Sequence, residues 1–67
     1  MNTENTISQG FDCEIDQREW LSCKASSESL EMFLISDGNS LGGVAIGRDQ
    51  IQNLIDFLER SKQVVRP

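Results

Sequence analysis

The chain has 67 residues, of which 25% are charged and 37% hydrophobic, with a formal net charge of −5 and no histidine. This length allows one domain with a thin core, whose stability depends on a covalent staple or a partner. The acidic balance disfavours nucleic acid, because phosphate binding relies on Lys and Arg, and it suits a basic protein surface. Two cysteines without a histidine cannot supply the four ligands of a structural zinc site. We therefore expect no metal and no cofactor.

The first ten residues are polar, with Ile7 the only large apolar residue after the initiator. They contain neither the basic nor the apolar region of a signal peptide, and nowhere in the chain do about 20 apolar residues follow one another as a membrane span requires. We expect residues 1–10 to form a flexible tail, unless a first strand begins near Ile7. We also expect a cytoplasmic protein whose cysteines stay reduced.

The segment from Phe11 to Asp16 alternates apolar and acidic residues. A period of two is typical of a half-buried strand. The pattern predicts a first strand over residues 11–16, with these side chains facing a core: Phe11, Cys13 and Ile15.

Two connections from this strand to the next remain open. If residues 16–20 form the connection, Ile15 pairs with Leu21 and Cys13 with Cys23, so the first strand turns its apolar side to the face that the helix covers. A tighter turn pairs Ile15 with Trp20 and sends that side to the other face. We favour the first connection. In it the two cysteines are cross-strand neighbours close enough for a disulfide, although we expect them to remain free thiols.

The segments Trp20 to Ala25 and Leu30 to Ser36 read as a second and a third strand, joined by the four-residue loop 26–29. One face of this hairpin is then wholly apolar, and the other carries an opposite-charge pair. A slip of one residue would mix the two faces, so the register is well determined. The loop length predicts these pairs: Ala25 with Leu30, Cys23 with Met32, Leu21 with Leu34, Lys24 with Glu31, Ser22 with Phe33 and Trp20 with Ile35.

The second face of this hairpin holds Trp20, Phe33 and Ile35, which are also large and apolar. One helix covers only one side of a small sheet, and strands that are apolar on both sides normally lie between two layers. We predict that these three residues form an interface with another molecule. Phe57, at the margin of the helix stripe described below, is a further candidate.

The segment 37–43, DGNSLGG, is rich in turn formers and predicts a mobile connection between two strands. Glycine-rich loops often carry contacts, which makes Asp37, Asn39 and Ser40 candidate contact residues. The segment lacks the terminal acid of a calcium loop and the Gly-Lys-Ser/Thr of a phosphate loop.

Val44 to Ile46 reads as a short fourth strand, and Gly47 occupies the N-cap position of the only convincing helix. Apolar residues then recur at i, i+3, i+4 and i+7, which is the core-facing stripe of an amphipathic helix: Ile51, Leu54, Ile55 and Leu58. We expect an α+β fold, a small antiparallel meander of three to four strands followed by one C-terminal helix packed on one face. The domain spans residues 11–63, and 64–67 form a C-terminal tail.

Three strands, a glycine-containing loop and the stretch GGVAIGRDQIQNLIDFL resemble, in their order, the transcriptional-coactivator single-strand-binding family. That resemblance implies a β4α fold and dimerisation. This chain lacks the Lys- and Arg-rich strands that hold the nucleic-acid backbone in that family.

The sequence contains no histidine, no tyrosine and no serine nucleophile motif, and its cysteines have acids and apolar residues as neighbours. We therefore do not expect this protein to be an enzyme. The prediction is a small acidic protein-binding module, of the class of accessory inhibitors encoded by phages and mobile elements, which occludes a larger protein and acts as a homodimer or higher oligomer. Two alternatives remain: a single-strand nucleic-acid-binding dimer, and an oligomer that sequesters a small ligand through the loop 37–43.

Overall fold

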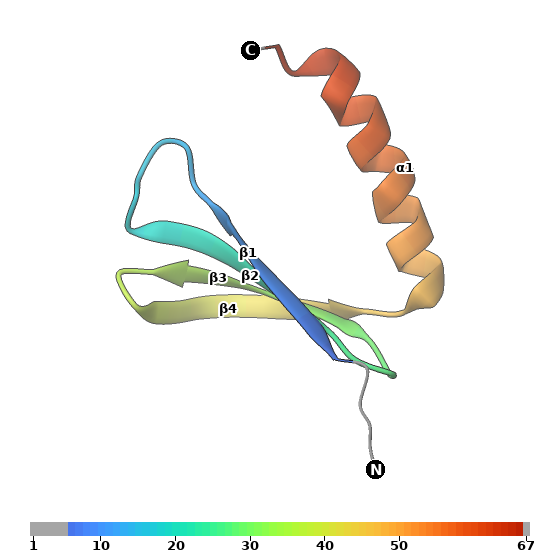
Figure 1. Cartoon of the computed structure of the whole chain (residues 1–67), viewed down its shortest axis with the longest axis horizontal. Helices are drawn as coiled ribbons and strands as arrows, with labels where there is room; N and C mark the ends of the chain where they lie inside the picture. The colour runs from blue at the N-terminus through green and yellow to red at the C-terminus, as the bar shows by residue number, and fades with distance from the viewer. Residues whose placement is uncertain (1–5, 67) are drawn as a thin grey trace.

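The computed structural model describes residues 6–66, which form one four-stranded sheet followed by one helix (Figure 1). The strands are antiparallel neighbours in chain order, so the sheet is a simple meander. This confirms the predicted α+β architecture of a meander and a C-terminal helix. The elements are β1 (Ile7–Asp12), β2 (Glu19–Ala25), β3 (Leu30–Ser36), β4 (Asn39–Ile46) and α1 (Arg48–Val64).

The hairpin of β2 and β3 has the register that its loop length and its two faces predicted. Leu21 lies opposite Leu34, Lys24 lies opposite Glu31, and every other predicted pair is also present. The loop closes through the Ser26 N–H, which donates to the Ser29 carbonyl at 3.0 Å. The prediction for this hairpin is confirmed in full.

The prediction of a mobile connection over residues 37–43 is wrong. Asp37 and Gly38 have φ values of 52° and 83°, which is the two-residue type I′ turn that Asp-Gly favours in hairpins. β4 therefore begins at Asn39 rather than Val44, and it pairs with β3 along its whole length. The register shifts between Leu34 and Ile35, so the extra residue of β4 forms a bulge beside Gly42, whose φ is 136°.

The prediction of a first strand over residues 11–16 is wrong too. β1 ends at Asp12, and its pairs include Phe11 with Leu21 and Gln9 with Cys23. The Cys13 N–H donates to the Glu19 carbonyl at 3.0 Å, but neither Cys13 nor Ile15 pairs with the β2 residue that either predicted register gave it, so both registers fail. Phe11 nevertheless shares a sheet face with Leu21, as the favoured register required.

The predicted N-terminal tail is corrected over residues 7–10, which belong to β1, and the alternative of a strand beginning near Ile7 is confirmed. Residues 1–5 lie outside the described part of the chain. The misplaced strand has a physical reason, because the alternation of apolar and acidic residues continues into the β1–β2 loop. There Ile15 is 96% exposed and contributes to no core.

The helix begins directly after Gly47, as predicted, and includes Val64, the first residue of the expected C-terminal tail. However, the expectation that α1 packs on one face of the sheet is wrong within one chain. α1 diverges from the sheet (Figure 1), and extensive contacts between elements occur only between neighbouring strands. A single residue, Gly47, joins β4 to α1, which is shorter than the two to six residues that usually join a strand to a helix packed on it.

Within residues 6–66 no side chain is buried, so the single chain has no closed core. No helix in that range has the length and hydrophobicity needed to cross a membrane. The sheet is held by its backbone ladders, and both of its faces are open to whatever lies next to them.

Candidate functional site

One face of the sheet, called face A, is mostly apolar, and its one charged residue, Glu19, lies at the end of the face opposite Ser36. The hairpin registers and the alternation of strand side chains define it. It contains a shallow hollow of about 160 Å³, whose lining includes Phe11, Cys23 and Leu30. The central part of face A consists of Ile7, Gln9, Phe11, Leu21, Cys23, Ala25, Leu30, Met32, Leu34, Val44 and Ile46, and Glu19, Ser36, Asn39 and Gly42 continue the face at one end.

The side chains of face A are largely uncovered. Ile7 is 72% exposed and Val44 is 58% exposed, at the two outer strands, while Met32 in the centre of the sheet is only half-buried. The hydrophobic pattern predicted that the helix of the same chain covers this face, and the structure does not place the helix there. The largest apolar surface of the sheet therefore has no cover.

The opposite face, called face B, brings together three of the predicted interface residues: Trp20, Phe33 and Ile35. Two of them lie against glycines of neighbouring strands. A Cβ added at Gly10 would approach the Trp20 Cε3 to 2.9 Å, and one added at Gly43 would overlap the Phe33 ring. The two aromatic rings thus rest on strand backbone, and each remains 37% exposed.

The structure does not bring Phe57, the fourth predicted interface residue, to face B. It lies on α1 with 57% of its surface exposed. The Arg60 guanidinium sits 5.9 Å from the centroid of its ring, which is within the range of a cation–π contact.

The candidate contact residues Asp37, Asn39 and Ser40 lie at the β3–β4 turn and the start of β4. The Asp37 N–H donates to the Arg18 carbonyl at 2.9 Å, which ties this turn to the β1–β2 loop. The Asn39 side-chain amide reaches the Asp37 carbonyl at 3.5 Å. These residues therefore belong to a hydrogen-bonded hairpin end and not to a mobile loop.

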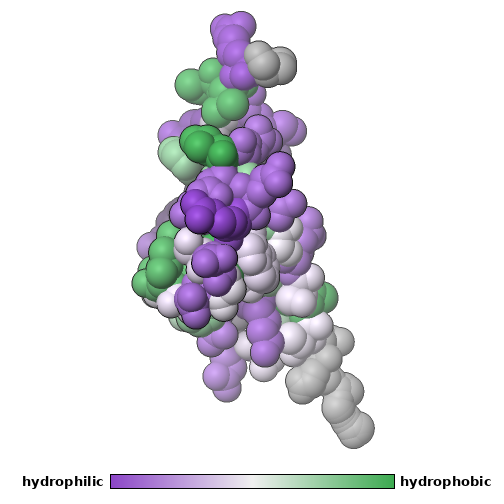
Figure 2. Space-filling model, turned by 90° about the vertical axis from the view of Figure 1, so that its left-hand side faces the viewer, coloured by the Kyte–Doolittle hydropathy of each residue, from purple (hydrophilic) through white to green (hydrophobic). Residues whose placement is uncertain are grey.

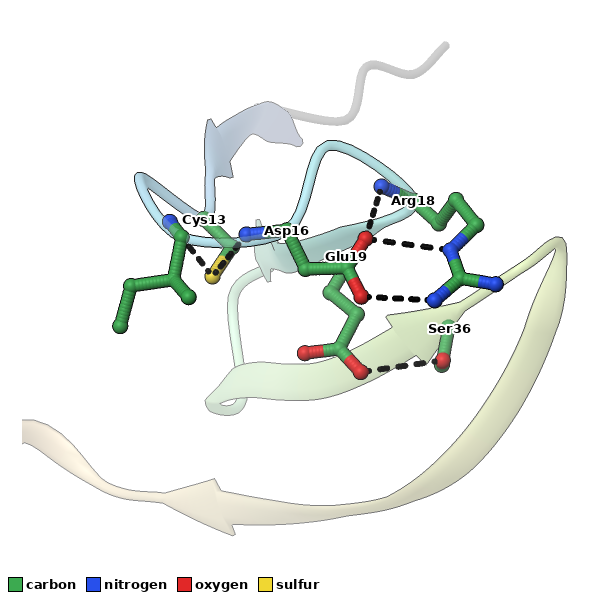
Figure 3. Close-up of polar contacts among 6 residues, drawn as sticks. Cys13, Asp16, Arg18, Glu19 and Ser36 are labelled. Atoms are coloured by element: carbon green, nitrogen blue, oxygen red, sulfur yellow. Dashed lines mark hydrogen bonds and ion pairs between the residues drawn. The ribbon is translucent and has the colours of Figure 1, made fainter.

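The β1–β2 loop contains a compact polar network that sequence analysis missed (Figure 3). The Asp16 carboxylate accepts from the Arg18 backbone N–H at 3.0 Å, and from Nε at 3.1 Å and Nη2 at 2.9 Å of the same residue. These interactions with the Arg18 side chain and backbone hold the pKa of the Asp16 carboxyl below its ordinary value, and the carboxylate raises the pKa of Arg18. Ser36 on β3 donates to Glu19 at 3.3 Å, which anchors the end of the loop.

The two cysteines are free thiols in different settings. The Cys13 sulfur accepts from the backbone N–H groups of Ile15 at 3.3 Å and Asp16 at 3.4 Å, so it helps to shape the β1–β2 loop (Figure 3). Cys23 lies on face A. Within residues 6–66 no group of three or more Cys, Asp or Glu side chains is placed to hold a metal ion.

The apolar stripe of α1 is the second uncovered surface. It consists of Ile51, Leu54, Ile55 and Leu58; the first two are half-buried and the last two exposed. Seen from the side, hydrophobic residues reach the surface both on the upper, helical part of the molecule and on the sheet below it (Figure 2). The chain thus has two separate apolar surfaces where a compact domain would have one core.

Comparison with protein-family models, curated proteins and solved structures finds no match to this chain. The resemblance to the single-strand-binding coactivators therefore rests on the order of the elements alone. The four strands and the helix do follow that order.

Proposed function

We propose that this chain is a small non-enzymatic protein-binding module that works in the cytoplasm and occludes a larger protein, in the manner of accessory inhibitors from phages and mobile elements. The observation that supports it best is face B, where Trp20, Phe33 and Ile35 lie together on a paired sheet. Aromatic residues of this kind dominate the energetics of protein interfaces. Rings that already rest on neighbouring backbone lose little conformational freedom on binding.

The charge of the chain indicates the chemistry of the larger partner. Face B carries the acids Asp12 and Glu31, with Lys24 directly across from Glu31, and the whole chain has a formal net charge of −5. A partner with an apolar depression bordered by Lys and Arg residues complements such a surface. The acidic side chains would steer the encounter, and the aromatic residues would supply most of the affinity.

A second candidate function is single-strand nucleic-acid binding by a dimer, since Trp20 and Phe33 on one sheet face could stack with bases. The only basic side chain on that face is that of Lys24, which lies opposite Glu31. This alternative requires affinity for oligonucleotides that falls steeply with salt. Absence of binding at low salt removes it.

The proposal can be tested by affinity capture from the source cells, with wild type compared to Phe33→Ser and Trp20→Ser. A protein enriched by wild type and lost with both variants is then purified and titrated with the chain, and we expect its activity to fall. Ile15→Ser is the matched control, because that apolar side chain is exposed in the β1–β2 loop and does not belong to face B. Circular dichroism confirms that each variant is folded. If the variants capture the same proteins as wild type, face B is not the binding surface.

A further inference from the structure

The single chain exposes more surface than a folded protein of its mass. Its accessible surface is 5856 Å², whereas a compact monomer of 7.5 kDa exposes about 4,200 Å². Its radius of gyration is 13.7 Å, against about 11 Å for a compact domain of 67 residues. Each chain therefore has more than about 1,000 Å² that a second layer should cover, and two chains together reach the range of obligate dimer interfaces.

The two uncovered surfaces match each other in chemistry. The central part of face A has no charged residue, with Glu19 at one end the only charge on the face, and the stripe from Ile51 to Leu58 has none at its four positions, although 25% of the chain is charged. The uncharged central part of face A is poorly suited to the basic partner that the acidic chain attracts, because Lys and Arg buried there would have no acid to pair with. It suits an apolar helix. Every copy of the chain brings one such sheet face and one such stripe.

The dimensions of the two surfaces also agree. The 17 residues of α1 make a helix about 25 Å long, and seven-residue strands such as β2 and β3 are about 23 Å long. Four strands place the outer pair about 14 Å apart, so one helix laid along the sheet covers its central strands. The hollow on face A, lined by Ile7, Phe11 and Leu30 among others, offers a place for a side chain of that helix.

The joint between β4 and α1 decides which copy supplies the helix. Gly47 is the only residue between the two elements, its backbone is extended (φ −91°, ψ −174°), and the Ile51 N–H already donates to its carbonyl at 3.0 Å. The first turn of α1 shares a hollow with Ala25 and the β2–β3 loop, and from there the helix leads away from its own sheet (Figure 1). Short joints of this kind favour exchange of an element between copies over closure within one chain.

We propose that two copies of this chain form a closed dimer in which each α1 lies across face A of the other copy. The exchange buries the stripe and face A of both copies and gives each sheet the second layer that it lacks. It rests on the proposed function, since it assigns face A to the second copy and leaves face B for the larger partner.

Disulfide trapping tests the exchange, because Cys23 lies on face A and Cys13→Ser makes it the only thiol. One chain carries Cys13→Ser alone. The other carries a mass tag, Cys13→Ser, Cys23→Ser and one new cysteine on the stripe, in separate variants Leu54→Cys, Ile55→Cys and Leu58→Cys. After the two chains are refolded together and mildly oxidised, we expect a covalent pair of unequal chains for at least one stripe position. Gln52→Cys, on the polar side of α1, should give at least tenfold less.

Light scattering on the wild type should show a mass twice the 7.5 kDa of one chain. Three results overturn the exchange: a folded monomer, an unfolded monomer, or a dimer whose stripe cysteines do not join Cys23 of the other chain. If exchange fails while capture of a larger protein still depends on Phe33, the proposed function stands. If the trapped dimer forms but no captured protein depends on Phe33, the exchange stands and the proposed function fails.

Discussion

The two faces of the sheet are both apolar, yet they are built differently. On face B the rings of Trp20 and Phe33 lie on the backbone of Gly10 and Gly43, so these aromatic residues cover neighbouring strands themselves. Face A has aliphatic side chains in cross-strand pairs such as Leu21 with Leu34, and the only glycine along it is Gly42 at the bulge. A face that its own rings cover can stay next to water until a partner arrives. A face of aliphatic side chains needs a permanent second layer.

The largest change in stability is expected at Leu34, which we compare with Ile35. The two residues are neighbours on β3 and face opposite sides of the sheet. In the single chain Leu34 is the more exposed of the two. If each chain folded alone, Ile35→Ala would therefore lower the free energy of unfolding more than Leu34→Ala. With face A covered by α1 of a second copy, Leu34→Ala should instead cost about 2–5 kcal/mol of stability, and Ile35→Ala only about 1 kcal/mol. Urea unfolding of both variants at one chain concentration measures the order. A larger loss for Ile35→Ala would mean that face A stays open.

A smaller effect is expected at the glycines under the aromatic rings of face B. An added Cβ at Gly43 meets both the Phe33 ring and the Met32 carbonyl oxygen, and the backbone oxygen cannot move aside. Gly43→Ala should therefore lower the unfolding free energy by about 1–3 kcal/mol. Gly10→Ala should cost less, since only the edge of the Trp20 ring has to move.

Gly47→Ala is the control for this pair, because no atom lies within 4 Å of its added Cβ and its φ of −91° suits any residue. Its stability should fall by no more than about 1 kcal/mol, because alanine is a poorer N-cap than glycine but meets no steric conflict here. Chemical denaturation of the three variants gives the comparison. Equal losses at Gly43 and Gly47 would contradict the packing of Phe33 on the β4 backbone.

The smallest effect lies outside both faces, at Asp16 in the β1–β2 loop. Arg18 holds the pKa of the Asp16 carboxyl below the ordinary value of 3.8. The interaction between the two residues therefore stabilises the folded chain at pH values above the unfolded pKa, and this stabilisation is lost as the pH falls through the folded pKa. Asp16→Asn should therefore be slightly less stable than wild type at pH 7, and the difference should shrink as the pH falls below the ordinary pKa of the carboxyl group and vanish below its folded pKa. The ion pair lies at the surface, with 70% of the Arg18 side chain exposed, so solvent screening keeps the effect small.

Unfolding curves for wild type and Asp16→Asn at neutral and acidic pH measure this difference. The mass of the assembly should not change with the variant, because the loop belongs to neither face. A dimer that dissociated on this substitution would show that the loop takes part in the interface.

The parts of the fold that the sequence predicted correctly are those that local rules determine. The β2–β3 register could be predicted because the loop length and both faces of the hairpin indicate the same pairing. A slip of one residue would mix apolar and polar side chains on each face. The start of α1 followed from Gly47 and the apolar stripe. The β3–β4 turn carried a usable signal as well, since Asp37-Gly38 is a strong hairpin pair, but the glycines after it drew the prediction towards a long loop.

The remaining errors depend on relations that no local pattern contains. The alternation from Phe11 to Asp16 does not show where pairing with β2 stops, and that point is set by the loop in which Asp16 holds Arg18. An amphipathic stripe shows that a helix needs an apolar surface but not which molecule supplies it. For the candidate site, the sequence grouped Trp20, Phe33 and Ile35 on one face correctly and missed that face A is the more exposed one.

One chain lacks a core, and in the proposed dimer a second copy supplies it. Thermal or urea unfolding at several chain concentrations tests this most directly. If folding requires the dimer, each tenfold rise in chain concentration should stabilise the folded state by about 1.4 kcal/mol and raise the unfolding midpoint. A cooperative transition whose midpoint is the same at every concentration would contradict the claim.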